Sequence, residues 1–481
     1  MELIKILHSN WKLLITLSIL LKWSISLSGY SGMGNPPLFG DFEAQRHWLE
    51  ITYSLPITSW YFFDLNYWGL DYPPLTAFHS YLLGYWADKI NPSWVELNTS
   101  RGSESKDLKS FMRLTALLTD NLIFLPASLY YIGSVKTKSK YLVLFTLLFS
   151  PALNIIDHGH FQYNSAMLGF SLGAIALIAN SHYCLGSMFF VMSLLFKQMA
   201  LFFALPFFFY LLSVCFHLKM TEGFYQLLKI GITVIFSFAI PILPFIYNIS
   251  TNELQINQLF QILHRVFPVA RGLYEDKVAN FWCAVSVVIK LREIFSLTDL
   301  IRLSIVSTLI AVLPSCVHLF LRPQMERFIV ALAISSLGFF LFSFQVHEKS
   351  ILLPLLPINL LYLTDPTFVL WFNNSALYSL WPLLKKDGLL IPYISTTLLW
   401  NLLNYNIWKV KSKFNYFTIV TYMAMLTSHI LEYYVVPPPS LPHIHILFNV
   451  LISASCFSIS FLYLYGKQFG LLPSPSKMKI D

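Results

Sequence analysis

Residues 11–30 read WKLLITLSILLKWSISLSGY, and residues 40–48 read GDFEAQRHW. The first stretch is an apolar run, interrupted at Lys22, with about the length that a membrane-crossing helix requires. No clear small-residue cleavage site follows it, so we interpret it as a retained first membrane helix rather than a secretory signal. The second stretch places charged groups directly after this helix, where a bilayer makes charge costly. The pair predicts a membrane fold with a polar functional segment beside its first helix.

The composition also places the chain in a membrane. Of its 481 residues, 56% are hydrophobic and 12% are charged, and the mean hydropathy is +0.61. A soluble domain of this size carries about a quarter charged residues. The net charge of +8 comes from short Lys and Arg clusters between apolar runs, without a basic stripe or an RNA-binding motif. We therefore assign this charge to membrane topology and expect no nucleic-acid partner.

About fourteen apolar runs follow one another along the chain. We predict an all-α polytopic membrane protein, a bundle of about fourteen transmembrane helices whose loops carry short interfacial helices. The split near Lys197 has the weakest signal, and a run at 280–289 predicts an interfacial or re-entrant segment. The predicted spans are 12–30, 111–133, 141–156, 163–181, 184–197, 198–217, 227–248, 300–321, 328–345, 349–364, 367–384, 389–408, 415–436 and 443–466.

Charge clusters predict how these helices are oriented. Most Lys and Arg residues outside the polar loops fall in connections that alternate to one side, which the positive-inside rule makes cytosolic together with both termini. Lys385-Lys386 falls on the other side and is the one clear exception. The clusters are Lys136/Lys138/Lys140, Lys219/Lys229, Arg322/Arg327, Lys409/Lys411/Lys413 and Lys467/Lys477/Lys479.

Two long polar loops then share the non-cytosolic face. We predict an N-terminal catalytic membrane module at 1–250 that contains loop 31–110, and a C-terminal membrane module at 251–481 that contains loop 251–299. The polar turns at 157–164 and 345–350 reach the same face. Irregular polar backbone at membrane depth is tolerated where it lines a cavity or is buried in protein, so we expect these segments to converge on one site.

Three signals concern the compartment. Asn-x-Ser/Thr sequons at Asn98, Asn248 and Asn373 lie near the predicted non-cytosolic face and fit the lumen of the endoplasmic reticulum (ER). Lys477 and Lys479 match the dilysine retrieval pattern of ER membrane proteins, although a plain basic tail explains them equally well. Five scattered cysteines show no metal spacing and predict neither a disulfide framework nor a zinc site.

Asp41 is the first candidate for chemistry. Its carboxylate would also serve as a simple cap for a helix that begins beside it. A cap does not account for Glu43, Arg46 and His47, which crowd the same turn of chain. A general base is a carboxylate within hydrogen-bond reach of the hydroxyl that it deprotonates, oriented by its neighbours. We therefore favour a catalytic Asp41, with Glu43 and Arg46 binding the acceptor or supporting the base.

Two further polar stretches offer acceptor-binding groups. Asp71 precedes Pro73-Pro74, which hold an extended turn, and it is either a structural carboxylate or an acceptor-binding one. His158 and His160 are spaced i, i+2 and do not form a helical metal pair. His160 and Gln162 donate and accept hydrogen bonds, as recognition of sugar hydroxyls requires.

His347 and Lys349 place a donor and a cation at a helix end on the same face. A phosphate leaving group needs such charges, because negative charge develops as it departs. An interfacial lysine paired with Glu348 is the plainer interpretation. Arg265 and Arg271 in the second polar loop could supply the same charge, and this loop could equally be a solvated surface.

Several common catalytic motifs are missing from the sequence. There is no phosphate-binding loop, no dinucleotide-binding glycine pattern, no nucleophile elbow and no kinase signature. The Asp-x-Asp pattern of nucleotide-sugar transferases is absent too. These absences disfavour a metal-held nucleotide donor and favour a donor that is carried by a lipid.

Five motifs together resemble a known family. They read GDFEAQRHWLEIT at 40–52, WGLDYPPLTA at 68–77, DHGHFQYN at 157–164, EDKVANFWC at 275–283 and HEKS at 347–350. In this order they are similar to the ER dolichyl-phosphate-glucose alpha-1,3-glucosyltransferases. Residues 44–47, 158–160, 197–199 and 275–279 look like the branch that adds the first glucose to the nine-mannose lipid-linked oligosaccharide, rather than the sister that adds the second. Beyond about residue 365 only the hydropathy is compatible.

The resemblance implies a fold of the GT-C type and inverting, metal-independent transfer of glucose from dolichyl phosphate glucose, without a cofactor. Asp41 matches the family's general base, which would deprotonate the 3-hydroxyl of the acceptor mannose. His347, Lys349 and Arg271 would bind the donor phosphate. A multi-helix transporter and a noncatalytic scaffold remain as alternatives, although no internal repeat of the transporter kind is apparent.

Overall fold

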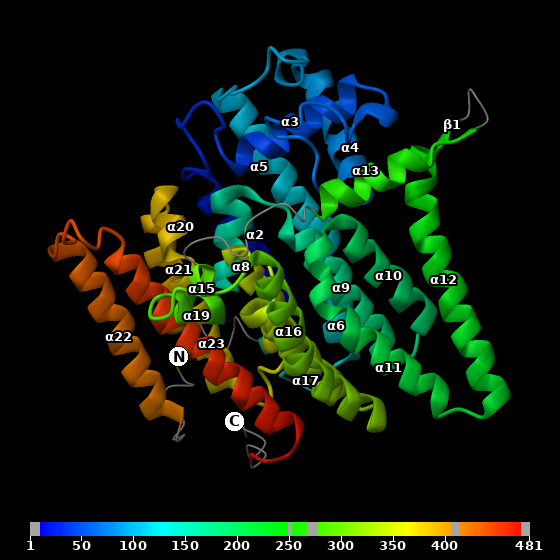
Figure 1. The fold of residues 1–481 in the computed structure, drawn as a ribbon, viewed down its shortest axis with the longest axis vertical. Coiled ribbons are helices and arrows are strands. Elements are labelled where there is room, and N and C mark those ends of the chain that lie inside the picture. The colour runs from blue at the N-terminus through cyan, green and yellow to red at the C-terminus, as the bar shows by residue number, and fades with distance from the viewer. Residues whose placement is uncertain (1–9, 138, 249–252, 268–277, 406–413, 473–481) are drawn as a thin grey trace.

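The predicted apolar runs are helical in the structure. The computed structural model describes residues 10–137, 139–248, 253–267, 278–405 and 414–472 (Figure 1). Within these residues each predicted run is helical over most of its length, so the prediction of helical apolar segments is confirmed. The weak split near Lys197 is confirmed as well, because α10 (Tyr183–Phe196) ends at an extended Lys197 before η5 (Gln198–Phe203) begins.

The helices of the apolar bundle pack side by side and mostly run along one axis (Figure 1). Besides α10 and η5, they are α2 (Trp11–Ser26), α5 (Lys106–Thr119), η3 (Asp120–Phe124), α6 (Leu125–Ser134), α7 (Lys140–Leu148), α8 (Pro151–Ile155), η4 (Ile156–Phe161), α9 (Asn164–Ala179), α11 (Ala204–Phe216), α12 (Met220–Ile246), α16 (Leu297–Leu321), α17 (Met325–Phe342), η6 (Glu348–Ile351), α18 (Leu352–Leu360), α19 (Pro366–Ser379), α20 (Trp381–Lys386), α21 (Leu390–Leu403), α22 (Phe414–Tyr434) and α23 (Ile444–Gln468).

The chain is a multi-pass membrane protein. Among the described residues, six helical segments are long and apolar enough to cross a bilayer by themselves. Other segments are shorter or interrupted, as where α5, η3 and α6 run on from one another through a π-helical turn. The six are Lys140–Phe161, Gln198–Phe216, Met220–Ile246, Leu297–Leu321, Met325–Phe342 and Ile444–Gln468.

A polar cap covers one end of the bundle (Figure 1). It contains α3 (Asp41–Ser54), η1 (Ile57–Ser59), α4 (Pro74–Ile90), η2 (Pro92–Trp94) and α13 (Ile256–Val266). A two-residue antiparallel pair, β1 (Tyr247–Asn248) with β2 (Glu253–Leu254), joins α12 to α13. The predicted interfacial run at 280–289 forms α14 (Phe281–Ser286), which α15 (Leu291–Ile294) follows. The fold is therefore helical apart from this small pair, within the described residues.

The cap has a hydrophobic core of its own. Trp48 and Ile51 of α3 pack there with residues of α4, α12 and α13. Gly84 allows α4 to approach α3 closely, since a Cβ atom at this position would lie 2.7 Å from the carbonyl oxygen of Leu49. This packing holds α3 rigidly above the membrane part and so fixes the position of its first residue, Asp41.

Three buried ionisable groups meet inside the bundle below the cap. Lys22 donates to Asp120 at 2.9 Å, and His158 Nε2 lies 3.0 Å from the same carboxylate. All three side chains are at most 2% exposed. Unpaired, each charge would be very costly in this apolar setting, and the pairing of opposite charges offsets that cost. The group ties α2 and η3 to η4, the turn that also carries His160.

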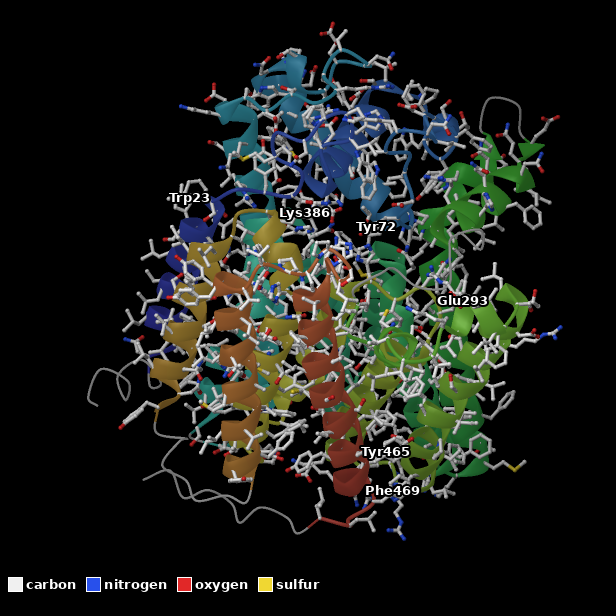
Figure 2. All side chains as sticks on the ribbon, turned by 60° about the vertical axis from the view of Figure 1, so that its left-hand side comes forward. Trp23, Tyr72, Glu293, Lys386, Tyr465 and Phe469 are labelled. Atoms are coloured by element: carbon white, nitrogen blue, oxygen red, sulfur yellow. The ribbon has the colours of Figure 1, made fainter. Side chains whose placement is uncertain are left out.

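Residues near two of the basic clusters lie at opposite ends of the bundle. Lys386 lies at the same end as Tyr72 of the cap, whereas Tyr465 and Phe469 lie at the opposite end (Figure 2). The exceptional Lys385-Lys386 pair is therefore on the cap side, as the alternation placed it. Lys385 is paired there with Glu432 at 2.7 Å, which reduces its weight as a topology signal.

The structure tests some of the signals for the compartment, namely the sequons and the dilysine tail. Asn373 is 0% exposed inside α19 and hydrogen-bonds to Ser150 and Asn359, so its sequon does not mark the non-cytosolic surface, and that expectation was wrong. Asn98, in contrast, is exposed on the cap. Residues 249–250 of the middle sequon and the tail with Lys477 and Lys479 lie outside the described residues.

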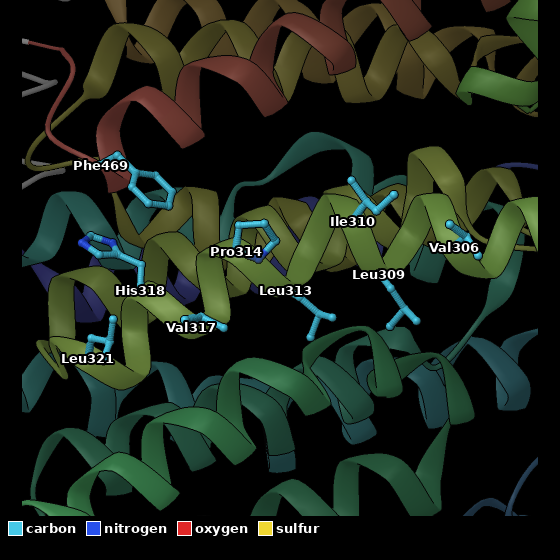
Figure 3. Close-up of a pocket in the computed structure, with 9 residues that line it drawn as sticks. All are labelled: Val306, Leu309, Ile310, Leu313, Pro314, Val317, His318, Leu321 and Phe469. Atoms are coloured by element: carbon cyan, nitrogen blue, oxygen red, sulfur yellow. The ribbon is translucent and has the colours of Figure 1, made fainter.

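An apolar groove follows the outer face of α16 (Figure 3). Its volume is about 660 Å³, and at one end the ring of Phe469 stacks on His318 with centroids 4.5 Å apart. Ile310 and Leu321 are more than half exposed, as expected for a surface in contact with hydrocarbon. The groove is separate from the polar groups below the cap. Its lining residues are Val306, Leu309, Ile310, Leu313, Pro314, Val317, His318, Leu321 and Phe469.

Candidate active site

Asp41 is the first residue of α3, and the loop before it is tightly folded. The N-cap residue Gly40 has φ of +77°, and a Cβ atom there would lie 2.9 Å from Ser31 Oγ. The Asp41 amide donates to that same hydroxyl at 3.2 Å. A carboxylate at a helix N-terminus is stabilised by the helix dipole. The tight loop therefore fixes the position of Asp41, and the helix N-terminus favours its ionised form.

Three side chains from distant parts of the chain hydrogen-bond to this carboxylate. His160 Nε2 lies 3.0 Å from Asp41 Oδ2, and Gln162 Nε2 lies 2.5 Å from it. Lys349 Nζ donates to the same oxygen. The side chain of Asp41 is 25% exposed, and among the described residues all three side-chain donors end on Oδ2. Among the described residues, no side-chain donor binds Oδ1.

The ionised form of Asp41 is strongly favoured. Burial would raise the pKa of its carboxyl, but the charge of Lys349 and the hydrogen bond from His160 outweigh burial and hold the pKa well below its usual range. The carboxylate is therefore ready to accept a proton at neutral pH. A low pKa makes it a modest base, so its effect must come largely from position.

The side chains that hydrogen-bond to Asp41 contact further polar groups behind them. His160 Nδ1 lies 2.5 Å from Asp387 Oδ2, and Lys349 Nζ lies 3.2 Å from His160 Nε2. Lys197 donates to the side-chain oxygen of Gln162 at 3.3 Å, which directs the Gln162 amide group toward Asp41. The positions of His160 and Gln162 are therefore set by further polar contacts.

Lys197 connects this cluster to Asp157 and to the turn before α4. It donates to Asn164 at 2.6 Å, and Asn164 donates to the buried carboxylate of Asp157 at 2.9 Å. The Lys197 ammonium also lies 4.8 Å from the ring centre of Tyr72, the neighbour of Asp71. The Asp71 turn predicted from the sequence thus faces the same cluster. Pro73 and Pro74 begin α4 as its N-cap and first residue.

Glu43 and Arg46 face away from Asp41 into the cap. Arg46 forms two hydrogen bonds with Glu43, at 2.6 and 2.7 Å, and one with Glu50 at 2.8 Å. Glu50 also accepts from His47 at 3.0 Å. Burial would raise the pKa of Glu50, yet His47 and Arg46 lower it to about 2. Glu43, Arg46 and His47 therefore cluster with one another, as predicted, and form a buried ionic network with Glu50.

The remaining predicted phosphate ligands lie in different surroundings. His347 is 42% exposed and pairs with Glu348 at 3.0 Å, whereas Lys349 is nearly buried against Asp41. Arg265 binds the carbonyl oxygens of Gly69 and Leu70 at 2.9 and 3.1 Å and so holds the turn before Asp71. Arg271 lies outside the described residues.

Sequence reasoning missed Asp387 entirely, and it left Lys197 out of the site. Asp387 follows two lysines in a turn between apolar helices and belongs to no motif. Its one usable signal was an acid at the end of an apolar segment on the predicted non-cytosolic face. Lys197 carried a stronger signal, because a lysine between two apolar runs is rare unless it is paired. Among the described residues, no group of three or more His, Cys, Asp or Glu side chains is placed to hold a metal ion.

Comparison with known proteins gives the family. A sequence model described as the ALG6, ALG8 glycosyltransferase family matches residues 15–464, well beyond the last motif at 347–350. The chain is 43% identical over 481 residues to the probable dolichyl pyrophosphate Man9GlcNAc2 alpha-1,3-glucosyltransferase of Schizosaccharomyces pombe, with 97% of this chain and 93% of the relative covered.

Two further relatives agree with this match. The dolichyl pyrophosphate Man9GlcNAc2 alpha-1,3-glucosyltransferase of Saccharomyces cerevisiae is 43% identical over 500 residues, covering 94% of this chain and 90% of the relative. The Gallus gallus protein of the same name is 47% identical over 400 residues, covering 81% and 78%. The family resemblance seen in the five motifs is confirmed, and the enzyme prediction replaces the transporter alternative. The chain belongs to the ALG6, ALG8 glycosyltransferase family and is a glycosyltransferase.

Proposed function

We propose that the protein is a dolichyl pyrophosphate Man9GlcNAc2 alpha-1,3-glucosyltransferase of the ER membrane. It transfers the first glucose from dolichyl phosphate glucose to the lipid-linked oligosaccharide used in protein N-glycosylation. The relatives named above support this acceptor, because each carries it in its name. Addition of the second glucose, the sister reaction, has no such support among them.

One observation carries the chemistry: within the described part of the chain, the three side-chain donors to Asp41 all bind Oδ2 and none binds Oδ1, while the side chain is 25% exposed. A base that must receive a proton needs an accessible lone pair and a fixed orientation. The three donors on Oδ2 provide the orientation and leave Oδ1 for the hydroxyl of the acceptor. In our proposal Asp41 is the catalytic base.

The reaction then balances at this oxygen. Asp41 Oδ1 takes the proton of the 3-hydroxyl of the acceptor mannose as its oxygen attacks the anomeric carbon of glucose. The bond between that carbon and the phosphate oxygen breaks, and dolichyl phosphate leaves with the bonding electrons. Attack from the opposite face converts the beta-linked donor into an alpha-linked product, as in other inverting glycosyl transfers.

The leaving phosphate gains negative charge and requires cations nearby. Lys349 touches Asp41 and is the nearest described cation, and His347 lies two residues before it at the exposed edge of the site. We assign both to the donor phosphate, together with Arg271 of the second polar loop. Stabilisation of developing charge by fixed cations is often the largest single contribution to such a step.

The acceptor side is assigned to groups below the cap. His160 and Gln162 contact Asp41 directly, and Asp71 lies in the turn that Arg265 holds. In this assignment they bind the acceptor sugar or orient the base. Glu43 and Arg46 support the base indirectly by fixing α3. No metal or other cofactor enters the proposal, and transfer in the presence of a chelator such as EDTA tests that expectation.

The wider architecture follows from the same assignment. We propose a GT-C type bundle of about fourteen transmembrane helices, built from a catalytic module at 1–250 and a second module at 251–481. The cap with Asp41 faces the ER lumen, and both termini are cytosolic. Phe469, two residues after Lys467, lies at the end opposite the cap, and the positive-inside rule makes an end with such a lysine cytosolic, which supports this orientation. Cysteine accessibility at position 33, in the loop before Asp41, and at position 472 would test it.

A transfer assay with two acceptors tests the proposed function. Purified protein in detergent receives dolichyl phosphate glucose and either the mannose-terminated or the monoglucosylated lipid-linked oligosaccharide. We expect glucose on the mannose-terminated acceptor only. Transfer to the monoglucosylated acceptor alone would move the protein to the sister reaction, and no transfer to either would refute the proposal.

A further inference from the structure

Asp387 lies directly behind the candidate base although it is far from it in sequence. It sits in the turn after α20, and its side chain is 2% exposed. Its Oδ2 contacts His160 Nδ1 at 2.5 Å, and the other ring nitrogen of His160 contacts Asp41 at 3.0 Å. One imidazole therefore bridges two carboxylates, one buried and one facing the site.

The turn that carries Asp387 is held in place from two sides. A Cβ atom on Gly29 would lie 2.7 Å from the backbone oxygen of Asp387, so only glycine permits this approach. Arg113 of α5 donates to the backbone oxygens of Gly29 and Gly159 at 2.8 and 2.7 Å. Gly159 precedes His160 in η4. The arginine thus locks the loop before Asp41 to the turn that presents His160.

The contacts restrict the protonation of His160. A neutral imidazole donates from one nitrogen only, and an imidazolium donates from both. With both nitrogens on carboxylate oxygens, the doubly protonated ring satisfies Asp387 and Asp41 together; Lys349 Nζ, 3.2 Å from Nε2, is then a neighbouring cation that shares Asp41 Oδ2 and not a donor to the ring. Two carboxylates then face two cations, His160 and Lys349, and the group carries no net charge. A balanced group is the arrangement that burial tolerates best.

We propose that Asp387 is a positioning residue of the glucosyl transfer. It keeps His160 oriented and protonated, so that the Nε2–H bond stays on Asp41 Oδ2 and Oδ1 points to the acceptor hydroxyl. The inference rests on the proposed function of Asp41 as the base. When Oδ1 takes the acceptor proton, the bond from His160 to Oδ2 remains in place, and Asp387 itself touches no substrate.

Other buried acids near the site do not share this arrangement. Asp157 accepts hydrogen bonds from Asn164 and from the backbone amide of Ser165, and neither of these groups contacts Asp41. The charge of Asp120 is met by Lys22 and His158, which do not contact Asp41. Asp387 alone among these acids is joined to the base through a single side chain. Its removal should therefore change catalysis before it changes binding.

The test is steady-state kinetics of Asp387→Asn in the two-acceptor assay. We expect kcat to fall by about tenfold or more, a part of the 10²–10⁴-fold that a positioned base contributes, with KM for donor and acceptor nearly unchanged. Asp365→Asn is the matched control, because Asp365 is also nearly buried and pairs with Lys467 and Tyr463 away from the site. We expect this control to keep its kcat within about twofold.

A double-mutant cycle with His160→Gln separates positioning from a structural role. If Asp387 acts through His160, adding Asp387→Asn to His160→Gln should lower kcat little further. Independent, multiplicative losses would overturn the inference, as would an unchanged kcat in Asp387→Asn.

If Asp387→Asn does not fold, Asp387→Glu keeps the charge but displaces it, and a wild-type kcat in that variant would equally overturn the inference. An inactive wild type would instead refute the proposed function, and the inference with it.

Discussion

Helix α3 carries two carboxylates two residues apart that are used in opposite ways. Asp41 is 25% exposed, and its side-chain donors all end on one oxygen. Glu43 is 2% exposed, and both of its oxygens are occupied, by Arg46, Tyr67 and the amide of Gly102. The comparison shows that a charged residue in a family motif is not by itself a reactive group. What separates the two is whether an acceptor oxygen remains available.

The helix geometry explains this division. Residues two positions apart point to nearly opposite faces of a helix, so Asp41 and Glu43 meet different neighbours. Asp41 faces η4 and η6, which bring polar groups from the membrane part. Glu43 faces the segment with Ser100, which accepts from Arg46 at 2.7 Å and closes the network inside the cap. One helix thus serves both as a scaffold and as the support of the base.

The largest effect should follow from opening the closed network. Arg46→Ala leaves Glu43 and Glu50 buried without their cation, which typically costs about 3–5 kcal/mol of folding free energy. We expect a strongly lowered unfolding temperature in detergent, measured by tryptophan fluorescence. Arg101→Ala, at a half-exposed arginine of the same cap, is the control. A normal unfolding temperature for Arg46→Ala would show that the network contributes little.

The next effect concerns the open carboxylate. Asp41→Asn removes the proton acceptor and keeps the shape of the side chain, so we expect transfer to fall by about a hundredfold or more with little loss of stability. Asp88→Asn is a matched control, since Asp88 is 23% exposed and binds Tyr53 on the outer side of the cap. Wild-type rates in Asp41→Asn would end the catalytic assignment.

Much of the bundle was predictable because its signal is local. An apolar run of sufficient length forms a helix wherever it lies, and the predicted runs are helical, although only six helical segments of the described residues are long and apolar enough to cross a bilayer by themselves. The convergence of Asp41, His160, Gln162 and Lys349 was predictable in part, since charge alternation put their segments on one face. Asp387 was not, because its partner is 227 positions away and nothing in its own turn marks it.

The hydrogen-bond partners of Glu43 and Arg46 are a second feature that could not be predicted from the sequence. Helical spacing grouped them with His47, and the three do lie together in one network. It could not say that Ser100 and Gly102 would return from a long loop and complete their hydrogen bonds. The sequon at Asn373 failed for the same reason, because a short pattern does not report that its residue is packed inside a helix.

A smaller effect is expected from the cation beside the open carboxylate. Lys349→Gln removes the charge that lowers the pKa of Asp41, so this pKa should rise toward its ordinary value. Because ionised Asp41 is the active form, kcat/KM should begin to fall at a higher pH in this variant than in the wild type as the pH is lowered. Lys385→Gln, next to Lys386 at the cap end of the bundle, is the control. Identical pH profiles for Lys349→Gln and the wild type would mean that another group keeps Asp41 ionised.

The smallest effect should come from trimming the closed network by one hydrogen bond. Tyr67 donates to Glu43 at 3.0 Å, and Tyr67→Phe removes only this hydroxyl while Arg46 and the Gly102 amide still hold the carboxylate. We expect a loss of about 1 kcal/mol in folding free energy and an unchanged kcat. A large fall in kcat with normal stability would mean that Glu43 takes part in the reaction. In that case the two carboxylates of α3 would have to be treated as one site, and the contrast between an open and a closed oxygen would no longer separate function from structure.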